Sequence, residues 1–157
     1  MTVLLAGCLV APPIEEEPFI DRPPEVEMSL VSPRAGTSVT FDLAIDPDVA
    51  FNVAGAVSDP DGDAIYYYWY LLHDEDEEGV APTSSLGPTF FLRPCSRLDE
   101  LAPGPADGGL TLRYLQLDIG DGPRLPEEQS EGEPRSYGDD VNVVTLTWVL
   151  VLRGTCP

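Results

Sequence analysis

The chain contains no lysine. Its eight basic side chains are all arginines, and they face 28 acidic residues, so the formal net charge is −20 over 157 residues. Such a field repels phosphate backbones and anionic lipid headgroups, which disfavours both nucleic-acid binding and electrostatic attachment to a membrane. The acidic surface is expected to aid solubility, while cations and basic partners remain open as ligands.

Long apolar runs and catalytic motifs are also missing. The first apolar run, at 3–11, is far shorter than the about 20 residues that span a bilayer, and the run at 145–152 is interrupted by threonine. We therefore predict no transmembrane helix. The sequence has no glycine-rich phosphate loop, no GxSxG, no HExxH and no CxxC, and these absences argue against the corresponding enzyme classes.

The chain has only three cysteines, and the first of them ends a short motif of small and apolar residues. Leu5, Ala6, Gly7 and Cys8 resemble the lipobox of bacterial lipoproteins, in which small residues admit a membrane peptidase and the thiol accepts the lipid. The resemblance implies that residues 1–8 are a truncated lipoprotein signal, with its basic front end expected upstream, and that acylated Cys8 anchors the chain in the lipid bilayer. The alternative is a buried N-terminal strand with an ordinary core cysteine.

Residues 9–25 are rich in proline and glutamate, which favours an extended, disordered tether. Fully extended as polyproline II, the tether would reach roughly 50 Å from the membrane. In lipoproteins a residue other than aspartate after the cysteine, here Leu9, implies sorting to the outer membrane. The expected location is thus the cell envelope, on the periplasmic or surface face.

The other two cysteines, Cys95 and Cys156, are expected to form a disulfide, because paired cysteines in an oxidising envelope usually bond. The competing role for Cys95 is a catalytic thiol, which needs a nearby base. The only histidine, His73, lies in the acidic stretch HDEDEEG, where solvation is favoured over metal binding or catalysis.

From residue 26 to residue 157 the chain shows short β-type runs separated by turn signals, which predicts one all-β domain. We expect an antiparallel sandwich of about seven strands and, apart from a single helical turn at 95–101, no helix. The predicted strands are 26–31, 37–45, 51–57, 64–72, 88–93, 110–119 and 141–152, and the predicted long loops are 101–109 and 123–140.

The stretch from Asp59 to Gly62 reads Asp-Pro-Asp-Gly, which suits a type I turn. Alternation in the strand that follows places Ile65, Tyr67 and Trp69 on one face, and we expect Trp69 and Trp148 in the core. Residues 53–69 resemble the turn and third strand of bacterial immunoglobulin-like domains of the polycystic-kidney-disease and cadherin-like kinds. That resemblance implies an immunoglobulin-like sandwich used for adhesion, spacing or ligand presentation.

The alternate aspartates Asp59, Asp61 and Asp63 also imitate the start of a calcium loop. An EF-hand is excluded, because Ala64 and Tyr70 stand where that loop needs glycine and a bidentate glutamate. Two interpretations stay open: turn chemistry alone, or a looser calcium site completed by another loop. The candidate loops carry Asp46 and Asp48, or Asp139 and Asp140.

Tyr66, Tyr68 and Tyr70 share the other face of the same strand. They are candidates for an aromatic platform that binds sugar rings. The alternative is that they cover the sheet against the loop at 123–140.

The leading hypothesis is a membrane-anchored envelope lipoprotein whose domain is a non-catalytic binding, adhesion or structural module for an unknown envelope protein or glycan, with calcium as a candidate stabiliser. The rival is a small glycan-acting or metal-dependent accessory enzyme, which should show carboxylates or His73 converging in a concave pocket. A third possibility is a subunit of a larger surface assembly, which should expose an apolar sheet face.

Overall fold

The computed structural model describes residues 20–45, 47–72, 87–97, 110–125 and 137–157, and over these residues the protein is all-β, as predicted. Two 3-10 helices, η1 (Leu43–Ile45) and η2 (Pro94–Arg97), interrupt the strands. The strands are β1 (Glu25–Val26), β2 (Ser38–Asp42), β3 (Val49–Asn52), β4 (Val57–Ser58), β5 (Tyr66–Leu72), β6 (Thr89–Leu92), β7 (Thr111–Gly120) and β8 (Val143–Arg153).

The strands form one four-stranded sheet, in the order β2-β8-β7-β5, and two short ladders, β3-β6 and β1-β4. Most neighbours are antiparallel, but β2 runs parallel to β8, with Phe41 opposite Leu152. The prediction of a wholly antiparallel architecture is therefore wrong at this edge. The parallel pair is possible because β2 and β8 are joined through almost the whole domain, which supplies the long crossover that parallel strands need.

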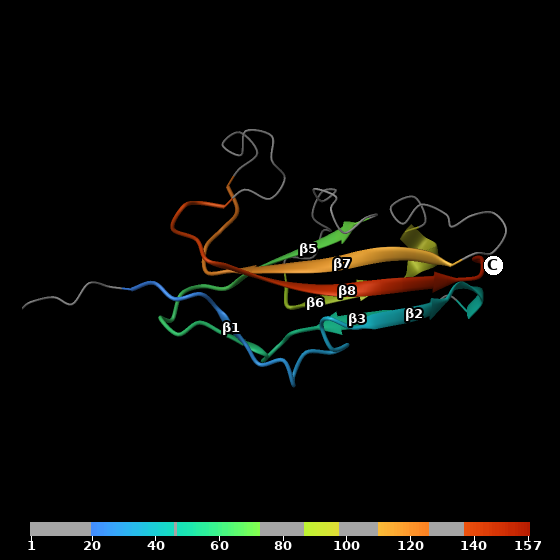
Figure 1. Cartoon of the computed structure of the whole chain (residues 1–157), viewed down its shortest axis with the longest axis horizontal. Coiled ribbons are helices and arrows are strands. Elements are labelled where there is room, and N and C mark those ends of the chain that lie inside the picture. The colour runs from blue at the N-terminus through green and yellow to red at the C-terminus, as the bar shows by residue number, and fades with distance from the viewer. Residues whose placement is uncertain (1–19, 46, 73–86, 98–109, 126–136) are drawn as a thin grey trace, which may run out of the picture.

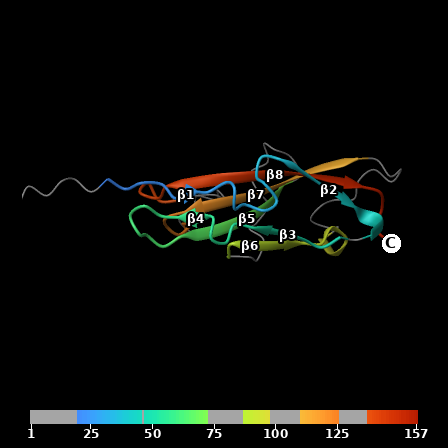
Figure 2. The ribbon, with the colours of Figure 1, turned by 90° about the horizontal axis from the view of Figure 1, so that it is seen from below.

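The β3-β6 ladder packs against the four-stranded sheet through aromatic rings, so the molecule has two layers (Figure 2). Trp69 of β5 stacks on Phe90 of β6 at 5.4 Å and on Trp148 of β8 at 5.7 Å, and Phe51 of β3 meets Trp148 edge-on. Both indole N–H groups donate to backbone carbonyls, those of Gly87 and Pro33. The predicted core positions of the two tryptophans are confirmed, and no buried indole nitrogen is left unpaired.

Side chains that cap the backbone shorten two of the predicted strands. After β1, the Glu27 carboxylate accepts from the amide and hydroxyl of Ser29, and this turn ends the strand predicted at 26–31. The strand predicted at 37–45 stops at Asp42, whose carboxylate accepts from the Ala44 amide in η1. Such local hydrogen bonds compete with the ladder, which explains why apolar alternation overestimates strand length here.

The strand predicted at 51–57 is two strands, β3 and β4, that belong to different ladders. Between them the Asn52 side chain accepts from the Ala54 amide, and Gly55 adopts a φ of 74°. The left-handed glycine turns the chain, so that β3 pairs with β6 and β4 pairs with β1.

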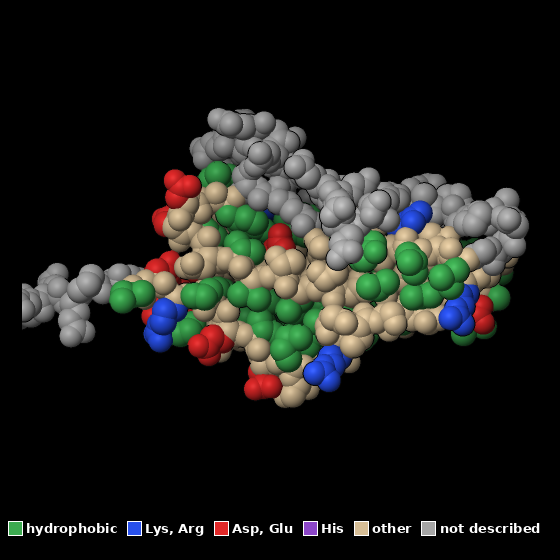
Figure 3. Space-filling view, viewed as in Figure 1, with side chains coloured by type: hydrophobic (Ala, Val, Ile, Leu, Met, Phe, Trp, Pro, Cys, Tyr) green, Lys and Arg blue, Asp and Glu red, His purple; other side chains and the backbone are tan. Residues whose placement is uncertain are grey.

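The molecule is elongated, and the described chain enters and leaves it at opposite ends (Figure 1). The first described residues, in blue, lie at the left end beside the turn that precedes β5, and the C-terminus lies at the right end. On the face shown in Figure 3, most of the described acidic side chains gather at the left end. Among the exposed large apolar side chains, Leu110 and Leu112 lie together before and in β7.

Candidate functional site

The Asp59–Asp63 turn is built by the side chain of its first residue. One carboxylate oxygen of Asp59, Oδ1, accepts hydrogen bonds from the amides of Asp61, Gly62 and Asp63 at 2.8, 2.8 and 3.0 Å. Gly62 has a φ of 87°, in the left-handed region that glycine tolerates best. The predicted role of Asp59 as acceptor for the turn's backbone is confirmed, and its Oδ2 is buried without a partner in the described part of the chain.

The second aspartate of the turn is occupied by an arginine from the N-terminal segment. Arg22 donates to Asp61 Oδ1 from Nη2 at 2.7 Å and from Nε at 3.1 Å, and its backbone amide donates to Asp61 Oδ2 at 2.8 Å. Nη2 also donates to the carbonyl of Pro60. These bonds hold the pKa of Asp61 below its usual value, because they favour the ionised carboxylate.

The third aspartate, Asp63, faces a pocket of about 580 Å³ beside the turn. Three further carboxylates from other segments, those of Asp21, Asp121 and Asp140, line the same pocket. The remaining lining residues are Gly122, Pro123, Leu125, Gly138 and Val141. Four acidic side chains from four separate stretches of sequence thus converge on one concavity.

Asn142 organises one wall of this pocket. Its side-chain amide donates to Asp21 at 3.0 Å and to Asp121 at 2.8 Å, and its backbone amide donates to the other oxygen of Asp121. Partial removal from water and the neighbouring charges of Asp121 and Asp63 raise the pKa of Asp21 above its usual value. The pocket is therefore electrostatically unfavourable to a further anion and attractive to a cation.

The carboxylates of the predicted calcium site have different surroundings. Across the described ranges, no three His, Cys, Asp or Glu side chains converge closely enough to hold a metal ion. Asp140 shares the pocket with Asp63, as the looser arrangement required, whereas Asp48 pairs with Arg93 at 3.3 Å. Asp46 lies outside the described residues, and a calcium role for the turn stays a prediction.

The three tyrosines of β5 lie on the outer face of the four-stranded sheet, where Arg124 and Tyr137 contact two of them. The Tyr70 side chain is fully buried, with its hydroxyl 3.3 Å from that of Tyr137. Tyr68 is half-buried, accepts from the Arg124 amide and meets the Tyr137 ring edge-on. Tyr70 thus offers no open ring face, so the predicted glycan contact, which stays a prediction, rests on Tyr66 and Tyr68.

The same face contains a buried carboxylate that the sequence analysis missed. Asp118 of β7 is 3% exposed and accepts from the hydroxyls of Tyr137 at 2.9 Å and Thr145 at 2.8 Å. Alternation places Asp118 on the outer face, which a sequence argument takes as solvent-exposed. The available signal was the alternative that the predicted loop at 123–140, which contains Tyr137, covers the tyrosines of this face.

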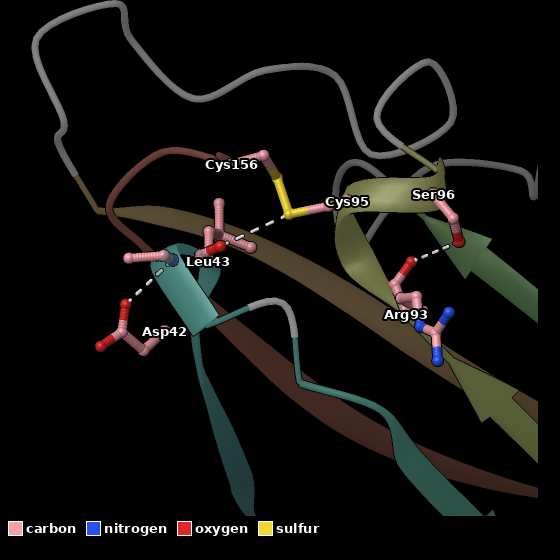
Figure 4. Close-up of a disulfide and its surroundings, with 7 residues drawn as sticks. Asp42, Leu43, Arg93, Cys95, Ser96 and Cys156 are labelled. Atoms are coloured by element: carbon pink, nitrogen blue, oxygen red, sulfur yellow. Dashed lines mark hydrogen bonds between the residues drawn. A yellow bond between two sulfur atoms is a disulfide. The ribbon is translucent and has the colours of Figure 1, made fainter.

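At the opposite end, Cys95 and Cys156 form the predicted disulfide (Figure 4). Their Cα atoms are 5.7 Å apart, and the Cys95 sulfur lies 3.5 Å from the Leu43 carbonyl oxygen, so the bridge joins η2, the C-terminus and the region of η1. Catalysis by a free Cys95 thiol is thereby excluded in this oxidised form. The lipidation candidate Cys8 and the histidine His73 lie outside the described residues.

No protein-family model, curated protein or solved structure matches the chain. In the described residues, no helix has the length and apolar character needed to cross a membrane.

Proposed function

We propose that this chain is a lipid-anchored cell-envelope protein whose acidic domain is a non-catalytic binding, adhesion or structural module. The observation that carries the proposal is the Cys95–Cys156 disulfide. Stable disulfides belong to oxidising compartments, so the bridge supports an exported protein. An exported protein would also meet the membrane peptidase that a lipobox serves, so export supports lipidation at Cys8.

We further propose that the domain is an immunoglobulin-like sandwich. Three features support it: the β2-β8-β7-β5 order, a second layer that contains β3 and β6, and a buried tryptophan, Trp69, on the strand that follows the Asp59–Asp63 turn. A buried tryptophan between two packed sheets, as Trp69 of β5 is here, is a hallmark of that architecture. Such domains serve mainly as spacers and binding surfaces, which accords with a module function.

The anchor would hold the domain by its acidic end. Because the segment contacts the domain from Asp21 onward, the spacer between Cys8 and the domain is reduced to residues 9–20, with a reach of roughly 37 Å as polyproline II. That length exceeds the about 8 Å Debye length at physiological salt, so the carboxylates would be screened from an anionic leaflet. The disulfide end would then point away from the membrane.

The lipid anchor is tested by labelling cells that express the protein from its own gene with an alkyne fatty acid. Wild-type protein should carry the label and partition into detergent, and Cys8→Ser should lose both properties. The control is the double variant Cys95→Ser, Cys156→Ser, which removes the two cysteines that form the disulfide and that the proposal does not acylate. An unlabelled wild-type protein in the aqueous phase would exclude lipid anchoring.

The second candidate is the small glycan-acting or metal-dependent accessory enzyme, and one observation favours it. Carboxylates converge in a concave pocket, and one of them, Asp21, has a raised pKa. Perturbed acids in a cleft are typical of catalytic sites, although structural ion networks also produce them. This candidate predicts turnover of an envelope glycan that Asp63→Asn abolishes and that Asp139→Asn, outside the pocket lining, leaves intact.

A further inference from the structure

The N-terminal segment is attached to the domain both before β1 and along β1. Arg22 lies on the Asp59–Asp63 turn, and Asp21 accepts from Asn142 on the far side of the acidic pocket. β1 then pairs with β4, and the Glu27 amide donates to the Ala56 carbonyl. The segment expected to be a free tether up to Glu25 is therefore in contact with the domain from Asp21 onward.

Arg22 has the most specific of these contacts. Two guanidinium nitrogens and the backbone amide of one residue bind a single carboxylate, and Nη2 reaches the Pro60 carbonyl as well. The rigid fork of arginine suits this arrangement, which a lysine ammonium could not reproduce. The Asp61 side chain beneath is only 8% exposed, whereas Arg22 itself is 56% exposed.

The sequence around Arg22 favours docking. Pro23 follows Arg22, and a residue before proline avoids the helical region and stays extended. The amide of an extended residue is not used in a helical hydrogen bond and can donate elsewhere. Here the Arg22 amide donates to Asp61 Oδ2. On the other side, Asp59 holds the turn in shape with its own carboxylate, so the acceptor is formed independently of Arg22.

We propose that the Asp59–Asp63 turn is the docking site for Arg22, and that this clasp fixes the direction in which the N-terminal segment leaves the domain. The guanidinium takes the place at Asp61 that an aspartate-rich turn otherwise offers to a metal ion. The clasp goes beyond the proposed function and does not depend on acylation of Cys8. Where Cys8 is acylated, the clasp also sets which end of the domain faces the bilayer.

The test is a measurement of backbone motion in the full chain carrying Cys8→Ser, by ¹⁵N relaxation. In the parent protein, the heteronuclear NOE of residues 21, 22 and 25 should match that of β5. In Arg22→Gln it should fall to the values of a flexible chain at residues 21 and 22. Arg34→Gln is the matched control, because the described residues supply no ion pair to this exposed arginine, and it should change nothing.

Tryptophan fluorescence of Trp69 and Trp148 checks that each variant keeps its core. Flexible-chain values at residues 21 and 22 in the parent, or rigid values in folded Arg22→Gln, would overturn the proposal. A second measurement repeats the NOE experiment with about 1 mM calcium, a concentration at which extracellular calcium-binding modules bind the ion. The clasp predicts unchanged NOE values at this concentration, and release of the segment would show instead that a metal displaces Arg22.

Discussion

Aspartates that stand close together in the sequence have different roles in this protein. Asp59 shapes a turn, Asp61 binds Arg22, and Asp63 faces the acidic pocket. Asp118 lies buried between two hydroxyls on another part of the sheet. At the scale of the residue, the role of a carboxylate depends on which donors the rest of the chain brings to it.

The Arg22–Asp61 pair should stabilise the protein in a pH-dependent way. The pKa of Asp61 is lower in the folded than in the unfolded state, so its contribution is complete above the unfolded value of about 3.9 and is lost as pH falls through the folded value. The melting temperature of Arg22→Gln should lie below that of wild type near neutral pH, and the two should converge in acid as Asp61 becomes protonated in the folded state.

The nearby acids are the same in both proteins, so the comparison isolates the effect of the Arg22 side chain. They are Asp21, Glu25, Asp59 and Asp63. A difference between wild type and Arg22→Gln that grows in acid would contradict the assigned role of the pair.

Tyr137→Phe tests the buried hydroxyl at Asp118. The substitution removes one of two hydroxyl donors to this carboxylate, and a hydrogen bond to a charged group contributes about 1.5 to 3 kcal/mol. We expect a loss of that size in urea unfolding. Tyr66→Phe, on the same sheet face but exposed, should change stability by less than about 0.5 kcal/mol, and an equal loss in both variants would contradict the prediction.

At the scale of the element, the last four strands of the described chain, β5 to β8, were predicted closely, and the first four were not. The strands predicted at 64–72, 88–93, 110–119 and 141–152 correspond closely to β5, β6, β7 and β8. Their alternating apolar residues pack on the core, and this alternation can be recognised within each segment by itself. β1, β3 and β4 are short because Glu27 and Asn52 cap the backbone, and capping geometry is weakly encoded in apolar patterns.

The two phenylalanines of β6 provide an internal test of the two-layer packing. Phe90 is 2% exposed and stacks on Trp69, whereas Phe91 is 64% exposed on the other face of the same strand. Phe90→Ala should cost about 3 to 5 kcal/mol in chemical denaturation, and Phe91→Ala should cost less than about 0.5 kcal/mol. Similar losses in the two variants would show that β6 is not held by its inward face.

At the scale of the whole molecule, the two ends have different chemistry. The end where the described chain begins holds the acidic pocket and the Arg22 clasp, and the other end holds the disulfide (Figures 1 and 4). The bridge connects residues 61 positions apart and ties the C-terminus to η2. A closed loop of that length limits the unfolded chain more than the folded one.

Replacing both Cys95 and Cys156 with serine should therefore lower the free energy of unfolding by about 4 kcal/mol. Cys8→Ser is the control for loss of a thiol and should leave stability unchanged in the soluble protein. Guanidinium unfolding of the two variants measures the difference. A loss below about 1 kcal/mol in the double variant would mean that the C-terminal end is held by packing rather than by the bridge.

The sequence by itself determined the all-β class, the inward face of β5, the turn at Asp59 and the cysteine pair. Each of these depends on local chemistry or on a choice among very few residues. Only the tertiary structure decided that β2 runs parallel to β8, that the Tyr70 side chain is buried, and that Asp61 binds Arg22. Those outcomes depend on segments far apart in the chain, 39 residues apart for Arg22 and Asp61, and on donors that no local pattern places.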